Sequence, residues 1–337
     1  MLNATRAEFE KYTAQVASLN GVPSATSTFA VAPSIEQKLE ERIQQSSAFL
    51  KEVNVIGVDQ IKGEVLGLLA ASPVAGRTDT ATKDREPRSV DDLKSRGYEC
   101  EDTNFDTYIE YKKLDAWAKF PNFQPLVRNK MVEQCGRDRL MTGWNGTFAA
   151  SNTDPVAYPL LQDVNIGWLQ HLRTDAPQRV MTGVKMGDSG DYRNIDALAL
   201  DATNSLLDEW YRDANDVVAI LGRELLVDKY MAMINSPDSD APVHKQAMDT
   251  IMMNRTVGNR RAILVPFFPP RAVLFTKSKN LSIYYQNGSR RRRIEDQPRR
   301  NRIVDYNSVN EAYVIEDLGC CALIENIKLP DGQGGWA

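Results

Sequence analysis

The feature that most constrains the fold is a pair of strand patterns separated by a long polar insertion. Residues 61–70 (IKGEVLGLLA) and 98–111 (YECEDTNFDTYIEY) have the composition and alternation of β-strands. Residues 71–97 between them carry almost no large apolar side chain, and a connection of this length is uncommon inside a compact domain. We therefore predict a long β-hairpin that projects from the body. Because an isolated hairpin is marginally stable in water, it would be stabilised by lying across a neighbouring subunit.

The first 50 residues predict two amphipathic helices joined by a flexible link. Each helix begins with a capping-box pattern, Thr5 with Glu8 and Ser34 with Gln37. The link, residues 22–33, is rich in Ser, Thr, Ala and Pro, which is typical of flexible and protease-accessible segments. The second helix has one apolar stripe and must bury it either on the body or on another chain. Both alternatives stay open at this point.

The rest of the chain predicts a mixed α+β protein. A long helix is expected over Phe123–Gly143, and a short one over residues 161–172, before the Gly-rich loop 182–191. Residues 193–285 alternate helical and strand patterns, which favours an α/β or α+β domain of their own. The C-terminal part predicts separate strands at Asn301–Asp305, Ala312–Glu316 and Cys321–Ile327.

Composition excludes several classes of protein. The formal net charge of −4 argues against a protein that mainly coats nucleic acid, since such proteins are usually basic. No apolar run reaches the roughly 18 residues that a membrane span needs, and the N-terminus lacks a signal-peptide core. We expect no membrane association. The four cysteines form no CxxC pattern, so they predict buried thiols in a reducing compartment.

The motifs do not indicate catalysis. The strand–turn–helix pattern VVAILGRELLVDKY contains neither GxGxxG nor GxxxxGK[ST], and no GxSxG occurs in the chain. His171 and His244 have no motif around them and are expected to be surface or packing residues. We therefore predict that the chain is not an enzyme and has no catalytic residue, cofactor or metal site.

A basic run near the C-terminus is the one unusual electrostatic feature. Seven arginines fall between positions 290 and 302: Arg290, Arg291, Arg292, Arg293, Arg299, Arg300 and Arg302. Nucleic-acid contact would use them to neutralise phosphates, but the run lacks the aromatic residues of a stacking platform. A solvated turn is the second interpretation. We favour the third, in which Arg290, Arg291, Arg292 and Arg293 contact acidic groups of a neighbouring subunit, because the arginine fork suits carboxylates.

Blocks along the whole chain carry a family resemblance. They include TRAEFEKYTAQVASLNGV and PSIEQKLEERIQQSSAFL near the start, RGYECEDTNFDTYIEYKKLDAWAKFPNFQ and NIDALALDATNSLLDEWYRDANDVVAILGRELLVDKY in the middle, and NLSIYYQNGSRRRRIEDQPRRNRIVDYNSVNEAYVIEDLGCCALIENI near the end. In these blocks the chain resembles the major capsid proteins of peduovirus-type contractile-tailed bacteriophages. The resemblance is specific because so many blocks match in order.

The resemblance implies an α+β Hong Kong 97-like capsid fold with five parts. These are a scaffold-contacting N-terminal segment (1–29), an N-terminal arm (30–60), an extended β-hairpin loop (61–115), a peripheral domain with a long spine helix (116–192 and 291–337), and an axial domain (193–290).

The resemblance also implies a function. Subunits of that family form pentamers and hexamers of an icosahedral shell, the phage head, around double-stranded DNA. The implied partners are the chain itself, an internal scaffold that doubles as maturation protease, and portal and head-completion proteins. DNA would be enclosed without sequence-specific binding. The N-terminal segment would be trimmed near Phe29-Ala30. The implied location is the virion, after assembly in the bacterial cytoplasm. The alternative is a soluble nucleic-acid-binding protein that uses the Arg290–Arg302 run.

Overall fold

The computed structural model describes residues 1–65, 75–87, 96–117, 123–234, 255–331 and 335–336. The helices are α1 (Asn3–Asn20), α2 (Pro33–Gln45), α3 (Tyr111–Trp117), α4 (Phe123–Asn145), α5 (Trp168–Asp175), α6 (Ile195–Leu206), α7 (Glu209–Arg212) and α8 (Arg223–Ile234). The strands are β1 (Phe29–Ala30), β2 (Asn54–Val58), β3 (Lys62–Val65), β4 (Arg96–Glu99), β5 (Glu101–Asn104), β6 (Thr107–Glu110), β7 (Val180–Thr182), β8 (Val218–Leu221), β9 (Thr256–Val257), β10 (Arg260–Leu264), β11 (Val273–Thr276), β12 (Leu281–Gln286), β13 (Arg291–Gln297), β14 (Arg302–Ile315) and β15 (Ala322–Glu325).

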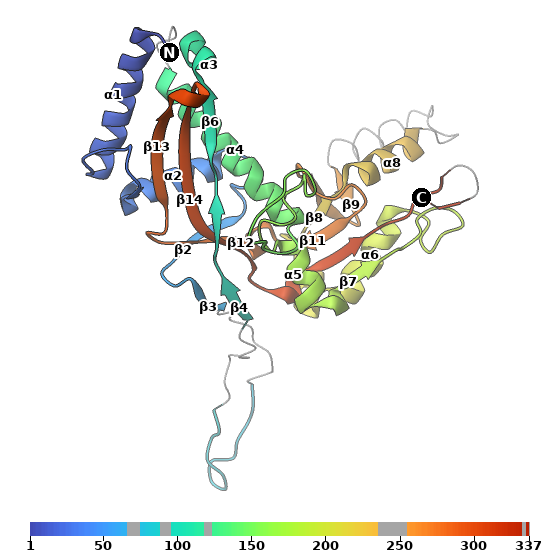
Figure 1. Cartoon of the computed structure of the whole chain (residues 1–337). Coiled ribbons are helices and arrows are strands. Elements are labelled where there is room, and N and C mark those ends of the chain that lie inside the picture. The colour runs from blue at the N-terminus through green and yellow to red at the C-terminus, as the bar shows by residue number, and fades with distance from the viewer. Residues whose placement is uncertain (66–74, 88–95, 118–122, 235–254, 332–334, 337) are drawn as a thin grey trace.

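Two sheets lie side by side in the molecule (Figure 1). The first has seven strands in the order β1-β13-β14-β12-β2, with β5 and β6 also paired to β14. The second has six strands in the order β7-β15-β11-β8-β10-β9. In Figure 1, α1 lies along the outer side of the first sheet, and α6 and α8 lie beside the second.

Strand β14 organises the first sheet and differs from its prediction. One continuous strand of 14 residues replaces the two separate strands expected at Asn301–Asp305 and Ala312–Glu316. The polar stretch between them does not break the strand because it is paired: Ser308 lies opposite Arg291 of β13 and Asn104 of β5. Polar side chains in this stretch therefore mark neighbours across the sheet, not a turn.

The second sheet confirms most of the expected elements of residues 193–285. Strand β8 and helix α8 confirm the strand–turn–helix pattern VVAILGRELLVDKY, and β8 and β10, which lie on either side of α8 in the chain, pair in parallel. The predicted domain limits at 192/193 and 290/291 do not follow the sheets, however. Strands β7 and β15 belong to the six-stranded sheet, while β12 belongs to the seven-stranded sheet. The apolar pattern at Cys321–Ile327 predicted β15 but not the sheet that it joins, and no pattern predicted β7.

A cluster of aromatic residues fills the space where the two sheets meet. We call Phe49, Trp144, Trp168, Phe268 and Tyr313 the aromatic cluster. The rings of Trp144 and Trp168 lie 4.8 Å apart between centroids, and the other neighbouring rings lie 5.1 to 5.4 Å apart. Trp168 also donates from Nε1 to the carbonyl oxygen of Ser282 in β12 at 3.0 Å. The aromatic cluster is part of a larger apolar core that also includes residues of β8, β11 and β15. This core joins both sheets.

The predicted hairpin is confirmed at its base. Strand β3 pairs antiparallel with β4, from Lys62 opposite Glu99 to Val65 opposite Arg96. Residues 75–87 lie far from both sheets in Figure 1, and every one of them is exposed. The parts of the prediction that fall on residues 66–74 and 88–95 lie outside the described residues.

Two predicted helix starts are wrong. Helix α1 begins at Asn3 without a side-chain cap from its own segment. Instead Asp115 of α3 accepts a hydrogen bond from the backbone of Leu2 at 2.9 Å, and Thr5 is buried. Helix α2 begins at Pro33 and has no side-chain cap. Proline at the first helical position needs no N–H partner, so the capping box predicted at Ser34 is not required.

The predicted helix over residues 161–172 begins late. Leu161 has a positive φ of 57°, and the following residues form turns. The helix starts only at Trp168, after the N–H of Gly167 bonds the carbonyl oxygen of Gly146 at 3.1 Å.

Candidate functional site: the junction of the N-terminal arm and the arginine strand

The structure brings together the two sets of residues that the sequence had singled out separately. Strand β1 pairs antiparallel with β13, so that Phe29 lies opposite Arg292 and Ala30 opposite Arg291. Val31 continues this pairing by donating its N–H to the carbonyl oxygen of Arg290 at 2.9 Å. Arg291, Arg292 and Arg293 therefore lie in a strand of the sheet, so the solvated turn, one of the three interpretations, does not describe them. Successive side chains of a strand point to opposite faces of the sheet, so neighbouring arginines alternate between buried and exposed positions.

Arg290 is buried in an ion cluster, which we define as Glu40, Arg139, Arg290 and Glu311. Arg139 of α4 reaches Glu40 of α2 at 2.6 Å and Glu311 of β14 at 2.5 Å. Arg290 pairs with the other oxygen of Glu40 and donates to Asn307 at 3.1 Å. The exposed fraction of these four charged side chains is at most 4%. Two cations and two anions thus balance each other away from solvent.

The pKa directions within the ion cluster agree with this balance. Burial alone would raise the pKa of Glu40, but the charges of Arg139 and Arg290 outweigh it and lower that pKa below the ordinary value. Burial likewise disfavours the charged form of Arg139, yet Glu311 and Glu40 raise its pKa. Glu36, one turn earlier on α2, differs because burial dominates and raises its pKa. The cluster therefore favours the charged forms of Glu40 and Arg139.

Arg292 ties helix α1 to the sheet. Its guanidinium forms two parallel bonds to Asp305 of β14, at 2.9 Å from Nε and 2.5 Å from Nη2. The same Nη2 donates to the hydroxyl of Tyr12 in α1 at 2.8 Å. Bidentate pairing of this kind adds geometric specificity as well as energy. Arg290 therefore holds α2 of the N-terminal arm, and Arg292 holds α1 of the segment before the arm.

Arg291 and Arg293 point the other way and are exposed. Arg293 pairs only with Glu295 on its own strand, at 2.9 Å. Arg290 is fully buried and Arg292 is bound to Asp305. Of the four arginines predicted to contact a neighbouring subunit, Arg291 and Arg293 are therefore the exposed ones, and their contact stays a prediction. Further along the chain, Arg299 and Arg300 lie in a short 3-10 turn. Arg302 lies over the ring of Tyr108, with 4.8 Å between its Cζ and the ring centroid.

The candidate processing junction is ordered and packed, contrary to the expected flexible link. Phe29 is buried with Val16, Ala25 and Ile294 in one apolar cluster, while Ala30 is exposed. Ala25 accepts a backbone hydrogen bond from Ile294 at 2.9 Å, and the amide of Ala32 bonds the side chain of Asn20 at 3.1 Å. Serine, threonine and proline in the link predicted flexibility, but its few apolar residues are enough to fix it on the sheet.

Sequence reasoning missed three members of the ion cluster: Glu40, Arg139 and Glu311. A signal was present, because Arg139 continues the buried positions Val132 and Cys135 of α4 at helical spacing. Glu40 likewise lies one turn before the buried Ile43. A charged residue inside an apolar stripe indicates a buried partner of opposite charge.

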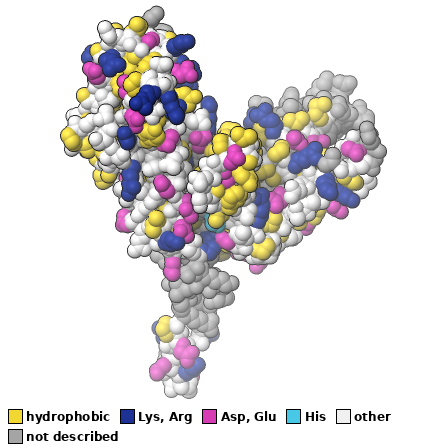
Figure 2. Space-filling view, in the orientation of Figure 1, with side chains coloured by type: hydrophobic (Ala, Val, Ile, Leu, Met, Phe, Trp, Pro, Cys, Tyr) yellow, Lys and Arg dark blue, Asp and Glu magenta, His cyan; other side chains and the backbone are white. Residues whose placement is uncertain are grey.

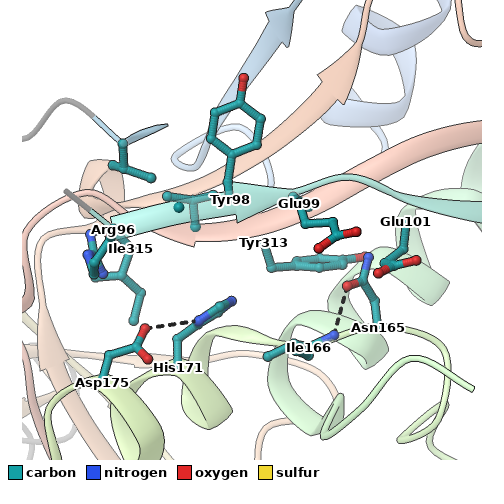
Figure 3. A pocket seen from close by; sticks show the side chains of 14 residues that line it. Arg96, Tyr98, Glu99, Glu101, Asn165, Ile166, His171, Asp175, Tyr313 and Ile315 are labelled. Carbon is teal, nitrogen blue, oxygen red and sulfur yellow. Dashed lines mark hydrogen bonds and ion pairs between the residues drawn. The ribbon is translucent and has the colours of Figure 1, made fainter. Parts of the chain in front are cut away.

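A second polar site lies under the base of the hairpin (Figure 3). A cavity of about 190 Å³ is lined by parts of β4, β14 and α5. Arg96 of β4 donates to the carbonyl oxygen of Glu316 at 3.2 Å, and His171 lies 3.2 Å from Asp175 on α5. The hydrogen bond from His171 lowers the pKa of Asp175. Arg96 therefore fastens the base of the hairpin to the end of β14, whereas the His171–Asp175 pair lies within α5. His171 is part-exposed on α5, whereas His244 lies outside the described residues.

The described residues contain neither a metal-binding cluster nor a membrane-spanning helix. They contain no group of three or more His, Cys, Asp and Glu residues that could hold a metal ion. No helix within the described ranges is long and apolar enough to cross a membrane. The described cysteines, Cys100, Cys135, Cys320 and Cys321, are all buried and free, and burial raises the pKa of each thiol. Buried thiols of raised pKa are unreactive.

Comparison with known proteins decides the family. The model of the P2 family of phage major capsid proteins matches residues 8–327. The chain belongs to this family. It is 41% identical to a capsid protein of Escherichia phage P2 over 98% of this chain and 96% of that protein. It is 39% identical to the major capsid protein of Serratia phage KSP20, covering 99% of this chain and all of that one.

Solved structures agree with the P2-family assignment. A chain of the satellite phage P4 procapsid, which includes the size determination (Sid) protein, has a TM-score of 0.81 at 39% identity, with 98% of this chain and 99% of that chain covered. The capsid of a native GTA particle has a TM-score of 0.52 at 12% identity over 84% of this chain and 90% of that one, which supports the fold alone. The predicted Hong Kong 97-like capsid fold is confirmed.

As a P2-family capsid protein, the chain has a structural role in a phage head. The alternative of a soluble nucleic-acid-binding protein is not supported, and Arg290 and Arg292 are bound within the chain. The face shown in Figure 2 agrees, because Lys and Arg side chains are interspersed there with Asp and Glu.

Proposed function

We propose that the chain is the self-assembling subunit of an icosahedral phage head, in which it forms the pentamers and hexamers that enclose double-stranded DNA. The observation that carries this proposal is its likeness to a procapsid chain over 98% of its own length. The acidic net charge of −4 suits a shell that holds DNA without gripping it, since each phosphate contact would oppose release. Assembly takes place in the bacterial cytoplasm, and the mature location is the virion.

The proposal is tested by expressing the full chain with the other head proteins of its phage and imaging the products by electron microscopy. Closed shells with five-fold and six-fold capsomers are expected. The chain expressed alone is the reference for spontaneous assembly. Only monomers or amorphous aggregate under the complete set of partners would refute the assignment.

The proposed partners are an internal scaffold that also acts as maturation protease, and the portal and head-completion proteins. Trimming between Phe29 and Ala30 would require β1 to leave β13, because Phe29 is buried in the present arrangement. A two-residue strand at a sheet edge offers few hydrogen bonds against such release. Intact-mass analysis of the chain from mature particles should give the mass of residues 30–337. An untrimmed mass in DNA-filled particles would contradict this step.

Arg291 and Arg293 are the proposed contacts to a neighbouring subunit. Both are exposed, and the pair of Arg293 with Glu295 is open to solvent, so both guanidinium groups can reach carboxylates of another copy. Replacing both by glutamate should lower the yield of closed shells without changing the far-UV circular dichroism of the free chain. The matched control is the double change Lys112→Glu and Lys113→Glu on α3, which reverses the same charge at exposed positions. Equal shell yields for the two variants would exclude this role.

A further inference from the structure

A groove on the N-terminal arm is not explained by the contacts within the chain. It has a volume of about 420 Å³ and lies between α1, α2 and α4. Its apolar lining comes from all three helices: Val16 and Leu19 of α1, Ile35 and Leu39 of α2, Met131 and Val132 of α4. Leu19 is 57% exposed. Three helices thus turn apolar side chains toward a shared groove that this chain leaves open.

The rim of the groove is basic. Lys38, Arg42 and Arg128 line it, and all three side chains are exposed. None of them forms an ion pair within the described parts of the chain, although most other arginines near the arm do. Burial and the neighbouring charge of Arg42 lower the pKa of Arg128. Cations that repel each other without a carboxylate between them favour an incoming anion.

We propose that this basic groove binds an acidic amphipathic helix of a partner protein. Its apolar side chains would enter between α1 and α2, and its carboxylates would meet Lys38, Arg42 and Arg128. Helix-in-groove recognition uses apolar anchors at helical spacing in this way. A nucleic acid fits less well, because seven apolar side chains, the six named above and Val31, line the groove while the cations lie at its rim. Complementary charge would also raise the association rate and fix the direction of the bound helix.

The groove depends on α1. Tyr12, Val16 and Leu19 form one wall of it, so removal of residues 1–29 would remove that wall. If the proposed trimming occurs, the partner helix can bind only the untrimmed chain. This consequence rests on the proposed function, whereas the binding measurement below does not.

The test uses the full, unassembled chain and designed helical peptides as probes. One fluorescent 18-residue peptide carries leucines on one face and glutamates on the other, and its partner peptide carries lysines in place of the glutamates. Fluorescence anisotropy should show at least ten-fold tighter binding of the acidic peptide. The double change Lys38→Glu and Arg42→Glu should reverse this preference. Leu19→Ala should weaken both peptides, and its exposed position protects the fold from the change.

The matched control is the double change Lys51→Glu and Arg137→Glu, at exposed positions outside the groove, which should leave both affinities unchanged. The proposal is overturned if the two peptides bind with equal affinity. It is also overturned if the groove variant and the control variant lose the same affinity for the acidic peptide. A labelled DNA duplex provides the comparison with nucleic acid. If the duplex binds more tightly than the acidic peptide, and the groove variant loses this binding, the groove is a nucleic-acid site instead. Sedimentation that shows self-association lost with Lys38→Glu and Arg42→Glu would assign it to a second copy.

Discussion

Two joints hold the molecule together, and they use opposite chemistry. The ion cluster fixes the N-terminal arm to α4 and β14 through directional bonds between charged groups. The aromatic cluster joins the two sheets through the contact of large rings. Apolar burial is non-directional and scales with area, whereas a buried ion pair is favourable only in the right geometry. The arm is therefore positioned by specific partners, and the two sheets are joined by buried area.

Both joints leave buried polar atoms unpaired in the part of the chain that the structure describes: Nε1 of Trp144 in the aromatic cluster, and two atoms in the ion cluster. Within the described chain, Oε2 of Glu311 and Nε of Arg290 are buried without a hydrogen-bond partner. Unpaired buried polar atoms cost free energy, so the cluster contributes less to stability than its number of bonds suggests. We infer that it selects one position of the arm over others.

The largest effect is expected at Arg139. Arg139→Met leaves Glu311 without a cation and Glu40 with only one, and breaking a buried ion pair in this way costs about 3–5 kcal/mol. The double change Arg139→Met with Glu311→Met removes both members of one ion pair and leaves the charges of Glu40 and Arg290 balanced. It should therefore recover most of the lost free energy of unfolding. Urea unfolding of the free chain, followed by far-UV circular dichroism, measures both. A double variant as unstable as the single one would show that charge balance is not the cause.

Acid should weaken the ion cluster before it weakens the aromatic cluster. The pKa of Glu40 is lowered from the ordinary value of 4.5, so its contribution to stability is complete above pH 4.5. That contribution is lost as the pH falls through the lower pKa of the folded state. Hydrogen exchange should therefore show amides of α2 losing protection with decreasing pH, while those of β8 keep theirs. Parallel loss in both elements would indicate global unfolding and contradict the distinction.

A glycine comparison tests how tightly the two joints are packed. A Cβ at Gly143 would lie 2.4 Å from the ring of Trp168, whereas at Gly136 it would meet the hydroxyl of Ser46 at 2.2 Å. The ring is fixed by its neighbours, whereas the hydroxyl can rotate away at the loss of one hydrogen bond, to the carbonyl oxygen of Ile43 at 2.6 Å. Gly143→Ala should therefore destabilise the chain by about 1–3 kcal/mol through overpacking. Gly136→Ala should be nearly neutral, because the better helix propensity of alanine, about 1 kcal/mol, offsets the adjustment. Thermal unfolding of both variants provides the measurement, and equal losses would contradict the difference in packing.

The sequence predicted the elements better than their partners. Helix α8, the long α4 and the base of the hairpin follow from local patterns of apolar residues. The arginine strand was missed because charged residues rarely form a strand on their own. Here β1 and β14 pair with it on both edges, and these pairs are distant in sequence. Similarly, Arg290 can be buried because Glu40 lies next to it in space. The two residues are far apart in the sequence, so no local pattern predicts their contact.

The smallest effect is expected at Arg293, three positions from the most buried arginine of the run. Its side chain is 44% exposed, and its partner Glu295 lies on the same strand. Exposed pairs of this kind contribute at most about 1 kcal/mol, so Arg293→Ala should shift the urea midpoint little. Arg290→Ala, which leaves one oxygen of Glu40 unpaired, should cost about 3–5 kcal/mol. A loss for Arg293→Ala as large as that for Arg290→Ala would mean that the arginine run acts as one electrostatic unit, and burial would no longer distinguish its members.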